Sequence, residues 1–387
     1  MRNRIVLDEL CEKKISTISS HYDGLIEYID ISSVDNFAKK IVSTQNLKAG
    51  EAPSRAKQLV EKNDILISTV RPNLNAIALI DREYDNLLVA STGYCVLRCK
   101  TGVNNRYVFY FCQSPYFIDD MTRQATGASY PAVSSSIVKS SLIPLRTADE
   151  QEKIVSIFDK VTELIILRKQ QLSKLDELVK ARFVELFGDP EKNKFSWKEE
   201  ELLEHLTVIG GYAFKSEQFS EDGIPVLRIG NINSGFFKPV NLVYWEDDDA
   251  LSKYKMYPGD LVMSLTGTVG KDDYGNVCIL GNDYDVYYLN QRNAKLELQD
   301  TINKYYLSML LKFEPVKKKL TGISRGVRQA NISNKDILNL SVPIPPIELQ
   351  NQFATFVEQT DKSKLEVQKS LEKLELLKKA LMQKYFG

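Results

Sequence analysis

The sequence has few residues of the kinds that hold metals or perform acid–base catalysis. His21 and His205 are the only histidines among 387 residues, and we expect both to be surface or core side chains. Cys95 and Cys99 are four residues apart without a second such pair, so no zinc site is expected. The five cysteines are an odd number without a paired framework, which predicts free thiols in a reducing, cytoplasmic protein. They are Cys11, Cys95, Cys99, Cys112 and Cys278.

Long apolar runs and an excess of one charge are also missing. No stretch of about 18 apolar residues is present, so no membrane span is expected. The first residues lack the apolar core of a signal peptide. The 51 Lys and Arg residues balance 51 Asp and Glu residues. This zero net charge disfavours an indiscriminate nucleic-acid binder, although it permits local basic faces.

Known nucleotide and catalytic motifs are absent as well. The stretch "LTGTVGK" (265–271) lacks two parts of a phosphate-binding Walker loop, because Leu265 replaces a glycine and Asp272 follows the lysine. No Rossmann fingerprint, methyltransferase tetrapeptide or nuclease carboxylate cluster occurs, and the acidic run 246–250 is interpreted as a solvated loop. We therefore predict a non-catalytic chain without cofactor or metal. An autonomous methylase or nuclease is the disfavoured alternative, and cofactor binding to the isolated chain would revive it.

The sequence instead contains an internal repeat. Residues 134–188 align without a gap on residues 333–387. The matched positions include Ser134 with Ser333, Pro144 with Pro343, Gln151 with Gln350, Leu172 with Leu371, and Gly188 with Gly387. Upstream the similarity is weaker and needs gaps, as between "TGASYPAVS" (126–134) and "TGISRGVRQANIS" (321–333). The chain thus consists of two copies of one unit, each with a divergent globular part followed by a better preserved segment.

Each preserved segment predicts a long helix. Residues 149–187 and 348–386 contain no Gly or Pro and are rich in helix formers. Apolar side chains recur at heptad spacing, namely Phe158, Ile165, Leu172, Leu175 and Val179 in the first, and Val357, Leu371, Leu374, Leu377 and Leu381 in the second. The two stripes can bury each other as an antiparallel coiled coil; the alternative is that each helix packs on its own domain. At ~1.5 Å rise per residue the rod would be roughly 55 Å long.

The globular parts predict a mixed α/β composition. Short β-rich runs such as 64–70 and 260–265 alternate with shorter helical stretches. The predicted fold class is α/β (α+β), with two mixed domains, two long antiparallel coiled-coil helices and a pseudo-twofold repeat. The predicted division is a first domain at 1–146, a helix at 147–190, a second domain at 191–345 and a second helix at 346–387.

Polar loops at corresponding places in both copies carry side chains suited to DNA. Arg can bind guanine with two hydrogen bonds, Asn and Gln can bind adenine, and small residues let the backbone approach phosphates. Candidates in the first copy are Arg71, Asn73, Thr92, Tyr94, Arg123, Gln124, Ser129 and Tyr130. Candidates in the second are Lys215, Thr266, Thr268, Lys271, Gln291, Arg292, Arg325, Arg328, Gln329 and Asn331. The alternative is that these are ordinary polar loops or subunit contacts.

Taken together, these features resemble the specificity subunit of a type I restriction-modification enzyme, over essentially the whole chain. The resemblance is carried by the duplication, by the "TG…S" loops (126–134 and 321–333) and by four stretches in order: "STVRPN" (68–73), "IPLRTADEQEKIVSIFDKV" (143–161), "LVKARFVELFGDP" (178–190) and "VPIPPIELQNQFATFVEQTD" (342–361). One departure is that the first domain starts abruptly, so its N-terminal elements are expected to be less complete than those of the second domain.

The resemblance implies two target-recognition domains, each binding half of a bipartite, asymmetric sequence in double-stranded DNA. It implies that the helices set the spacer and dock two modification subunits, which would carry S-adenosylmethionine and methylate adenine. A restriction subunit would add ATP-driven translocation and cleavage. The competing interpretation is an adaptor whose coiled coil joins two protein-binding domains. Without partners, the chain is expected to self-associate head to tail or to be poorly soluble, because the docking surface would be apolar.

Overall fold

The computed structural model describes residues 3–233, 235–271, 273–322 and 329–387 and divides the chain into two compact units. The first unit consists of residues 1–170 and 368–387, and the second of residues 171–367. Both long helices therefore contribute to both units. Within the described residues, no helix combines the length and apolarity needed to cross a membrane.

The two long helices are α5 (Ala148–Phe187) and α10 (Ile347–Phe386), each of 40 residues. Their predicted bounds are confirmed to within one residue. At the start of α5, Thr147 and Glu150 form a reciprocal cap: the Glu150 amide donates to Thr147 Oγ1 at 3.3 Å, and the Thr147 amide donates to Glu150 Oε2 at 2.9 Å. Gly188 follows α5 with a φ of 80°, a left-handed conformation that suits glycine and ends a helix.

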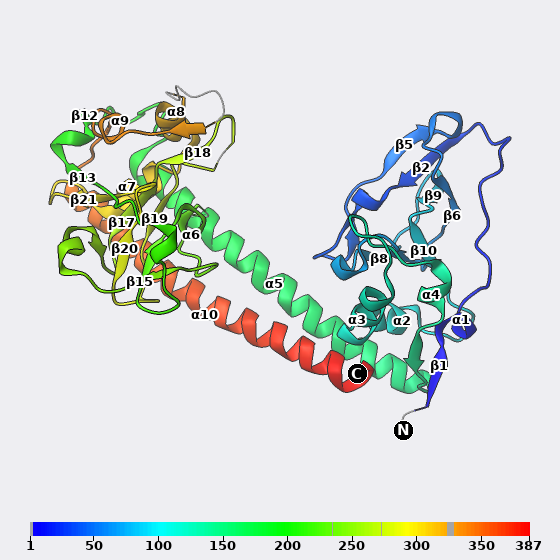
Figure 1. Cartoon of the computed structure of the whole chain (residues 1–387). Coiled ribbons are helices and arrows are strands. Elements are labelled where there is room, and N and C mark those ends of the chain that lie inside the picture. Colours follow the sequence, from blue (N-terminus) through cyan, green and yellow to red (C-terminus); the bar gives the residue numbers. More distant parts are fainter. Residues whose placement is uncertain (1–2, 234, 272, 323–328) are drawn as a thin grey trace. The chain divides into compact units, whose positions relative to one another are not determined.

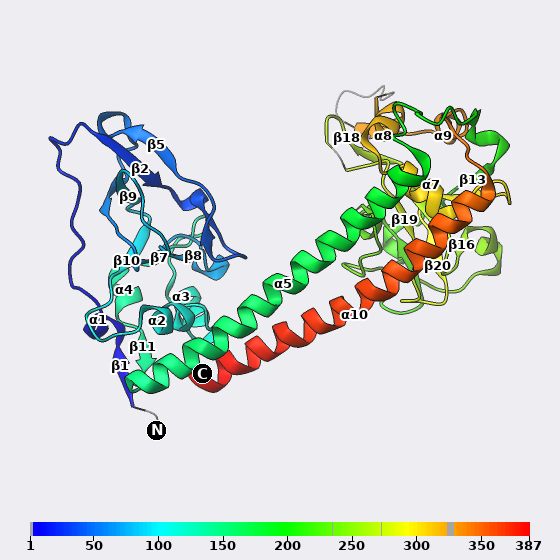
Figure 2. The same cartoon turned by 180° about the vertical axis from the view of Figure 1, so that it is seen from behind.

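In the first unit, the early turns of α5 pair with the last turns of α10. The ring of Phe158 stacks on Phe386 with centroids 5.8 Å apart, and Lys169 Nζ lies 3.1 Å from Glu375 Oε1. The residue number falls along α10 as it rises along α5, so the helices are antiparallel, as predicted. Figure 2 shows the C-terminal end of α10 beside the first half of α5, with α2 and α3 packed nearby.

The second unit contains the other halves of the same helices, and they pair in the same way. Phe183 meets Phe353 edge to face with centroids 5.4 Å apart, and Lys364 Nζ lies 2.7 Å from Asp176 Oδ1. The antiparallel arrangement is thus present in each unit. It confirms the predicted fold class of mixed α/β units with two long helices.

Most of the residues predicted for the helical seam are shielded from solvent. Phe158, Ile165, Val179, Val357 and Leu371 are buried, and Leu172, Leu175, Leu374 and Leu381 are half-buried. Leu377 is the exception, because 45% of its surface is exposed. Its assignment to the seam is wrong: the shielded positions in this part of α10 are Leu374, Lys378 and Leu381, and Leu377 lies about 100° from Lys378 around the helix.

The strands of the first unit form small sheets. One has the order β5 (Gln45–Lys48), β2 (Leu25–Ile29), β9 (Leu87–Ser91), β6 (Ala56–Leu59), and another β10 (Tyr94–Leu97), β7 (Ile65–Ser68), β8 (Ile77–Leu79) (Figure 1). Two pairs are β1 (Arg4–Val6) with β11 (Leu142–Pro144) and β3 (Val34–Asp35) with β4 (Lys40–Ile41). The short helices are α1 (Leu7–Leu10), α2 (Asn105–Phe111), α3 (Pro115–Gln124) and α4 (Ser135–Lys139). β2 and β9 are parallel, whereas the other neighbours are antiparallel.

The second unit repeats this plan, although the ladders differ in length between the two units. Its sheets have the orders β13 (Leu206–Gly210), β21 (Asn293–Leu298), β17 (Leu261–Ser264), β19 (Val277–Ile279), and β15 (Tyr244–Trp245), β14 (Ile224–Leu227), β20 (Tyr287–Leu289), β16 (Lys255–Met256). The pairs are β12 (Glu199–Glu201) with β23 (Ser341–Pro343) and β18 (Thr266–Thr268) with β22 (Gln329–Asn331). The short helices are α6 (Ile229–Ile232), α7 (Lys304–Leu310), α8 (Glu314–Thr321) and α9 (Asn334–Leu338).

Equivalent hydrogen bonds show that the repeat extends further upstream than the gap-free alignment. The Tyr107 hydroxyl donates to Pro144 O at 2.8 Å, and the Tyr306 hydroxyl donates to Pro343 O at 2.6 Å. Gln151 Oε1 accepts from the amide that precedes α2, and Gln350 Oε1 accepts from the amide that precedes α7. Each long helix is therefore fixed at its first turn to the same part of its own unit.

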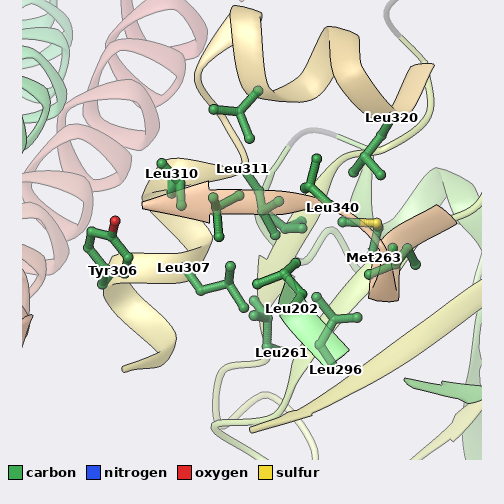
Figure 3. Packing of buried hydrophobic residues seen from close by; sticks show 14 of the residues in the cluster. Leu202, Leu261, Met263, Leu296, Tyr306, Leu307, Leu310, Leu311, Leu320 and Leu340 are labelled. Carbon is green, nitrogen blue, oxygen red and sulfur yellow. The ribbon is translucent and has the colours of Figure 1, made fainter. Parts of the chain in front are cut away.

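The last turn of each long helix completes a hydrophobic core. Phe386 is fully buried against Tyr107 and Phe111 of the first unit. Phe187 packs against Tyr306 in the second unit, with ring centroids 4.8 Å apart. Figure 3 shows the adjoining core, where leucines of α7 meet side chains from β17 and β21.

The structure also confirms that the N-terminal elements of the first unit are less complete. β1 pairs with β11 as β12 pairs with β23, so Arg4 corresponds to Glu199. Further along, however, the five-residue ladder between β13 and β21 has a single counterpart, the bridge between Cys11 and Cys99.

Replacing each terminal aromatic residue by alanine should weaken a different unit. We expect Phe386→Ala to destabilise the first unit and Phe187→Ala the second, each by ~3–5 kcal/mol, because each leaves a cavity in a core. Hydrogen exchange read by mass spectrometry would show which α2 or α7 peptides lose protection. Leu376→Ala, at an exposed position on α10, is the control and should change stability by less than ~0.5 kcal/mol. Equal loss of protection in both units from either variant would contradict this assignment.

Candidate nucleic-acid interface

In the first unit, three predicted polar loops come together through backbone hydrogen bonds. The Thr69 amide and hydroxyl both donate to Gly93 O at 2.9 Å. The Val133 amide donates to Thr69 O at 2.9 Å. The loops at 68–75 and 122–134 and the turn before β10 therefore form one surface, which the sequence predicted only as separate candidates.

Arg71 is held in place on this surface. Its φ of 49° is a left-handed conformation that non-glycine residues rarely adopt. Its amide donates to Pro131 O at 2.7 Å, and its guanidinium carbon lies 4.8 Å from the ring centroid of Tyr130. Both side chains are exposed. The guanidinium is thus stacked on an aromatic ring while its donors remain available to a ligand.

The other candidates of the first unit differ in accessibility. Thr92, Asn73, Arg123, Gln124 and Ser129 are all exposed. Tyr94 is only 1% exposed, and its hydroxyl donates to Asp30 O at 2.7 Å. Burial raises the pKa of this hydroxyl. The assignment of Tyr94 to DNA contact is therefore wrong, because the side chain belongs to the core.

In the second unit, β18 and β22 form a two-stranded ribbon at the corresponding place. Thr268 is exposed, and its amide and hydroxyl donate to Asp273 at 2.7 and 2.9 Å. The backbone hydrogen bond from Thr268 lowers the pKa of the Asp273 carboxyl. Thr266 is only 8% exposed and donates to Asn331 Oδ1 at 3.3 Å. Thr266 therefore supports the ribbon, which corrects its assignment as a contact residue.

The remaining candidates of the second unit lie on several segments. The Leu265 amide donates to Arg292 O at 2.8 Å, which places exposed Gln291 and Arg292 beside the ribbon. Lys271 is exposed, and its amide closes a turn onto Thr268 O at 3.0 Å. Lys215 and Asn331 are also exposed. Arg325 and Arg328 lie outside the described residues, and only the backbone of Gln329 is described.

The two surfaces are built on the same backbone arrangement. The Val133 amide donates to Thr69 O, and the Ile332 amide donates to Leu265 O at 2.8 Å. Each of these segments continues into a short helix capped by a serine, Ser134 in one unit and Ser333 in the other. The frame is shared, whereas the side chains that it presents differ.

The two histidines are a surface and a core side chain, as expected. His21 is exposed, and His205 is buried with its ring nitrogens 2.8 Å from Thr301 Oγ1 and from Glu200 Oε2. Among the described residues, no three His, Cys, Asp or Glu side chains are grouped as a metal site would require.

Sequence reasoning missed a groove in the first unit. A cavity of about 1040 Å³ lies between α2, α3, the turn at 35–40 and the two long helices. Its lining includes Phe37, which is 90% exposed, and Lys39. Lys39 Nζ donates to Asn75 O at 2.5 Å and to Asn75 Oδ1 at 2.8 Å. The lining comes from segments far apart in the chain, so no local motif marks it.

Lys39, which lines the groove, is expected to lose its proton at a lower pH than an ordinary lysine. Burial, followed by the nearby charge of Lys378, lowers the pKa of Lys39 to about 8. Because this pKa lies below that of the unfolded chain, the unfolded state binds more protons between about pH 8 and pH 10.4, and stability should rise with pH across this window. We expect the free energy of unfolding of the wild type to gain on the order of 1 kcal/mol relative to Lys39→Met between pH 8 and 10.

Chemical denaturation at several pH values, with NMR titration of the Lys39 side chain, would measure this effect. Lys40→Met, at the neighbouring exposed position, is the matched control and should follow the wild type. A Lys39 resonance that titrates with the bulk of the lysines would contradict the predicted shift.

Comparison with known proteins gives the family. The model of the type I restriction modification DNA specificity domain matches residues 5–177 and 196–376. The chain is 26% identical over 396 aligned residues to the type I restriction enzyme MjaVIII specificity subunit of Methanocaldococcus jannaschii, covering 96% of this chain and 87% of that protein. It is 27% identical over 173 residues to the EcoKI specificity subunit of Escherichia coli, covering 41% of this chain and 35% of that protein.

Solved structures agree at the level of the fold. A chain from a study of complex assembly and conformational transition of the type I R-M system matches with a TM-score of 0.61 at 23% identity, covering 99% of this chain and 97% of that one. The type I restriction-modification S subunit of M. genitalium matches with a TM-score of 0.57 at 15% identity, covering 100% and 96%. The chain belongs to the family of type I restriction-modification DNA specificity proteins, and the resemblance noted in its sequence is confirmed.

Proposed function

We propose that this chain is the sequence-recognising, non-catalytic subunit of a type I restriction-modification system. Each unit would bind one half of a bipartite, asymmetric target in double-stranded DNA. The observation that carries the proposal is the pair of equivalent polar surfaces, with the same backbone frame and different side chains. A protein that only joins two other proteins would not need two surfaces with the same backbone frame and different side chains. Family membership also favours DNA specificity over the adaptor interpretation.

The chemistry of the surfaces suits base recognition. Arg71 is held over Tyr130, so little side-chain entropy remains to be lost when its donors meet guanine in the major groove. Gln291 and Arg292 offer the corresponding groups for adenine and guanine in the second unit. The first half-site would therefore depend on Arg71, and the second on Gln291 and Arg292.

The zero net charge of the chain supports recognition as part of a complex. Binding of a duplex gains most of its affinity from neutralised phosphates. Partner subunits would supply much of that positive surface, and they are inferred to be two adenine methyltransferase subunits and a restriction subunit.

Exposed apolar side chains on the long helices support docking of such partners. Exposed apolar side chains that gather into a patch are typical of surfaces that bind another protein. They include Leu164, Leu167, Leu178, Leu376 and Leu377. We therefore place the methyltransferase contact on these helices, and expect the chain without partners to self-associate or to be poorly soluble.

Single arginine substitutions should change one half-site each. We expect Arg71→Ala to relax the first half-site and Arg292→Ala the second, each by ~1–3 kcal/mol of discrimination at the base affected. Long-read mapping of adenine methylation, in cells that express the chain with its modification subunit, would measure both. Arg82→Ala is a matched control, because Arg82 also lies 4.8 Å over a tyrosine ring but on a different loop. A variant that altered both half-sites equally would contradict the two-surface proposal.

Helix length should set the spacer between the half-sites. Deletion of residues 169–175 together with 368–374 removes one heptad at equivalent positions of both repeats. Each helix becomes ~10 Å shorter, which equals about three base-pair steps of duplex DNA. We expect the methylated motif to keep both half-sites while its spacer shortens by about that number. A shortened, folded protein that retained the original spacer would exclude this role of the helices.

A further inference from the structure

Cys11 and Cys99 face each other across a single antiparallel bridge in the first unit. The hydrogen bonds on either side are Glu12 N to Arg98 O at 2.7 Å and Lys100 N to Leu10 O at 2.9 Å. This pattern makes the two cysteines a non-hydrogen-bonded pair, in which the Cα atoms are about 4.5 Å apart and the side chains are close. Disulfides span Cα separations of about 4.4–6.8 Å, so the backbone already has the geometry of a disulfide.

The second unit has a pair of leucines at the equivalent place. There, Leu206 pairs with Leu298 at one end of a five-residue ladder between β13 and β21. The flanking bond from Gln299 N to His205 O, at 2.8 Å, is the equivalent of the one from Lys100 N to Leu10 O. The first unit thus has two thiols where the second has two leucines, and it has a single bridge where the second has a five-residue ladder. A covalent link would supply a further cross-strand attachment.

Access and charge differ between the two thiols. Cys99 lines a cavity of about 410 Å³ with Arg98 and Lys100, whereas Cys11 is fully buried. The hydrogen bond with Cys99 lowers the pKa of Cys11, and the charges of Lys139 and Lys100 act in the same direction against burial. The same hydrogen bond, together with burial, raises the pKa of Cys99. Of the two sulfurs, that of Cys99 is the one that a small solute can reach.

We propose that Cys11 and Cys99 are a redox-active pair that closes to a disulfide when a peroxide oxidises it. The Cys99 thiol gives up its proton and its sulfur attacks one oxygen of the peroxide; an S–O bond forms, the O–O bond breaks, and the departing hydroxide takes up the proton as water, which leaves a sulfenic acid. The Cys11 sulfur then attacks the Cys99 sulfur; the S–O bond breaks, and the hydroxyl leaves as a second water with the proton of the Cys11 thiol. Two thiols and one hydrogen peroxide thus give one disulfide and two waters.

The disulfide would fasten the N-terminal segment to the core. Cys11 directly follows α1, and β1 before it pairs with β11, close to the start of α5. One bridge holds this segment at Cys99 in the reduced protein. The oxidised protein therefore keeps the segment in place through openings that would free it in the reduced form.

The test uses the purified full chain, reduced and then exposed to hydrogen peroxide. We expect a cross-linked peptide containing Cys11 and Cys99, lighter by two hydrogen atoms and split by dithiothreitol. Amide exchange in residues 4–12 should slow by about tenfold or more on oxidation, since local openings of a terminal segment determine its exchange. Cys278→Ser removes a buried thiol of the second unit and is the matched control, which should oxidise like the wild type.

Two further variants, Cys11→Ser and Cys99→Ser, test whether these two cysteines form the disulfide. In Cys11→Ser, Cys99 should stop at a sulfenic acid that dimedone traps; Cys99→Ser should show neither the cross-link nor the exchange effect. A disulfide from Cys99 to Cys112 or Cys95 would overturn the assignment. So would a protein in which Cys99 reaches the sulfinic acid while Cys11 still reacts with an alkylating agent after unfolding.

Discussion

The structure depends on burying the two ends of each long helix in different units. At its start, α5 is fixed to the first unit by the side chain of Gln151, whose Nε2 also donates to Arg146 O at 3.0 Å. At its end, Phe187 completes the core of the second unit. In α10, Gln350 fixes the start of the helix to the second unit, and Phe386 at its end completes the core of the first unit. Each core therefore needs an aromatic residue from the helix that begins in the other unit.

Because each core needs a residue from a distant part of the chain, the topology affects the rate of folding. The first unit cannot close its core until residues 368–387 have been made and have reached residues 105–111. Contacts between residues so distant in sequence cost loop-closure entropy before they contribute any burial, which slows folding. The same anchoring residues recur in both halves, although Phe187 and Tyr306 of the second unit are much closer in sequence than Tyr107 and Phe386 of the first. The shared glutamine and phenylalanine positions are thus explained by packing, and they carry no information about the DNA sequence.

The parts of the fold set by local chemistry could be predicted, whereas those set by distant contacts could not. Both helices were expected to within one residue at their starts, because composition and capping act locally. Tyr94 was misassigned because every residue of β10 is buried, so alternation along the strand does not mark a solvent face. The groove around Lys39 and the bridge between Cys11 and Cys99 join segments far apart in the chain.

In the two polar surfaces, backbone hydrogen bonds hold the loops in place, and the side chains on those loops can vary. Hydrogen bonds such as Val133 N to Thr69 O, and Ile332 N to Leu265 O, need no particular side chain at the donor or acceptor. Side chains on this frame can therefore change without loss of the fold, and Arg71 can tolerate a left-handed backbone that costs ~1–3 kcal/mol, because neighbouring contacts hold it. In the proposed function, such a frame would supply discrimination between bases more readily than affinity. Because positive and negative side chains are equal in number, we expect partner subunits to supply much of the affinity for phosphates, so that recognition and attachment would be separable functions of the assembled complex.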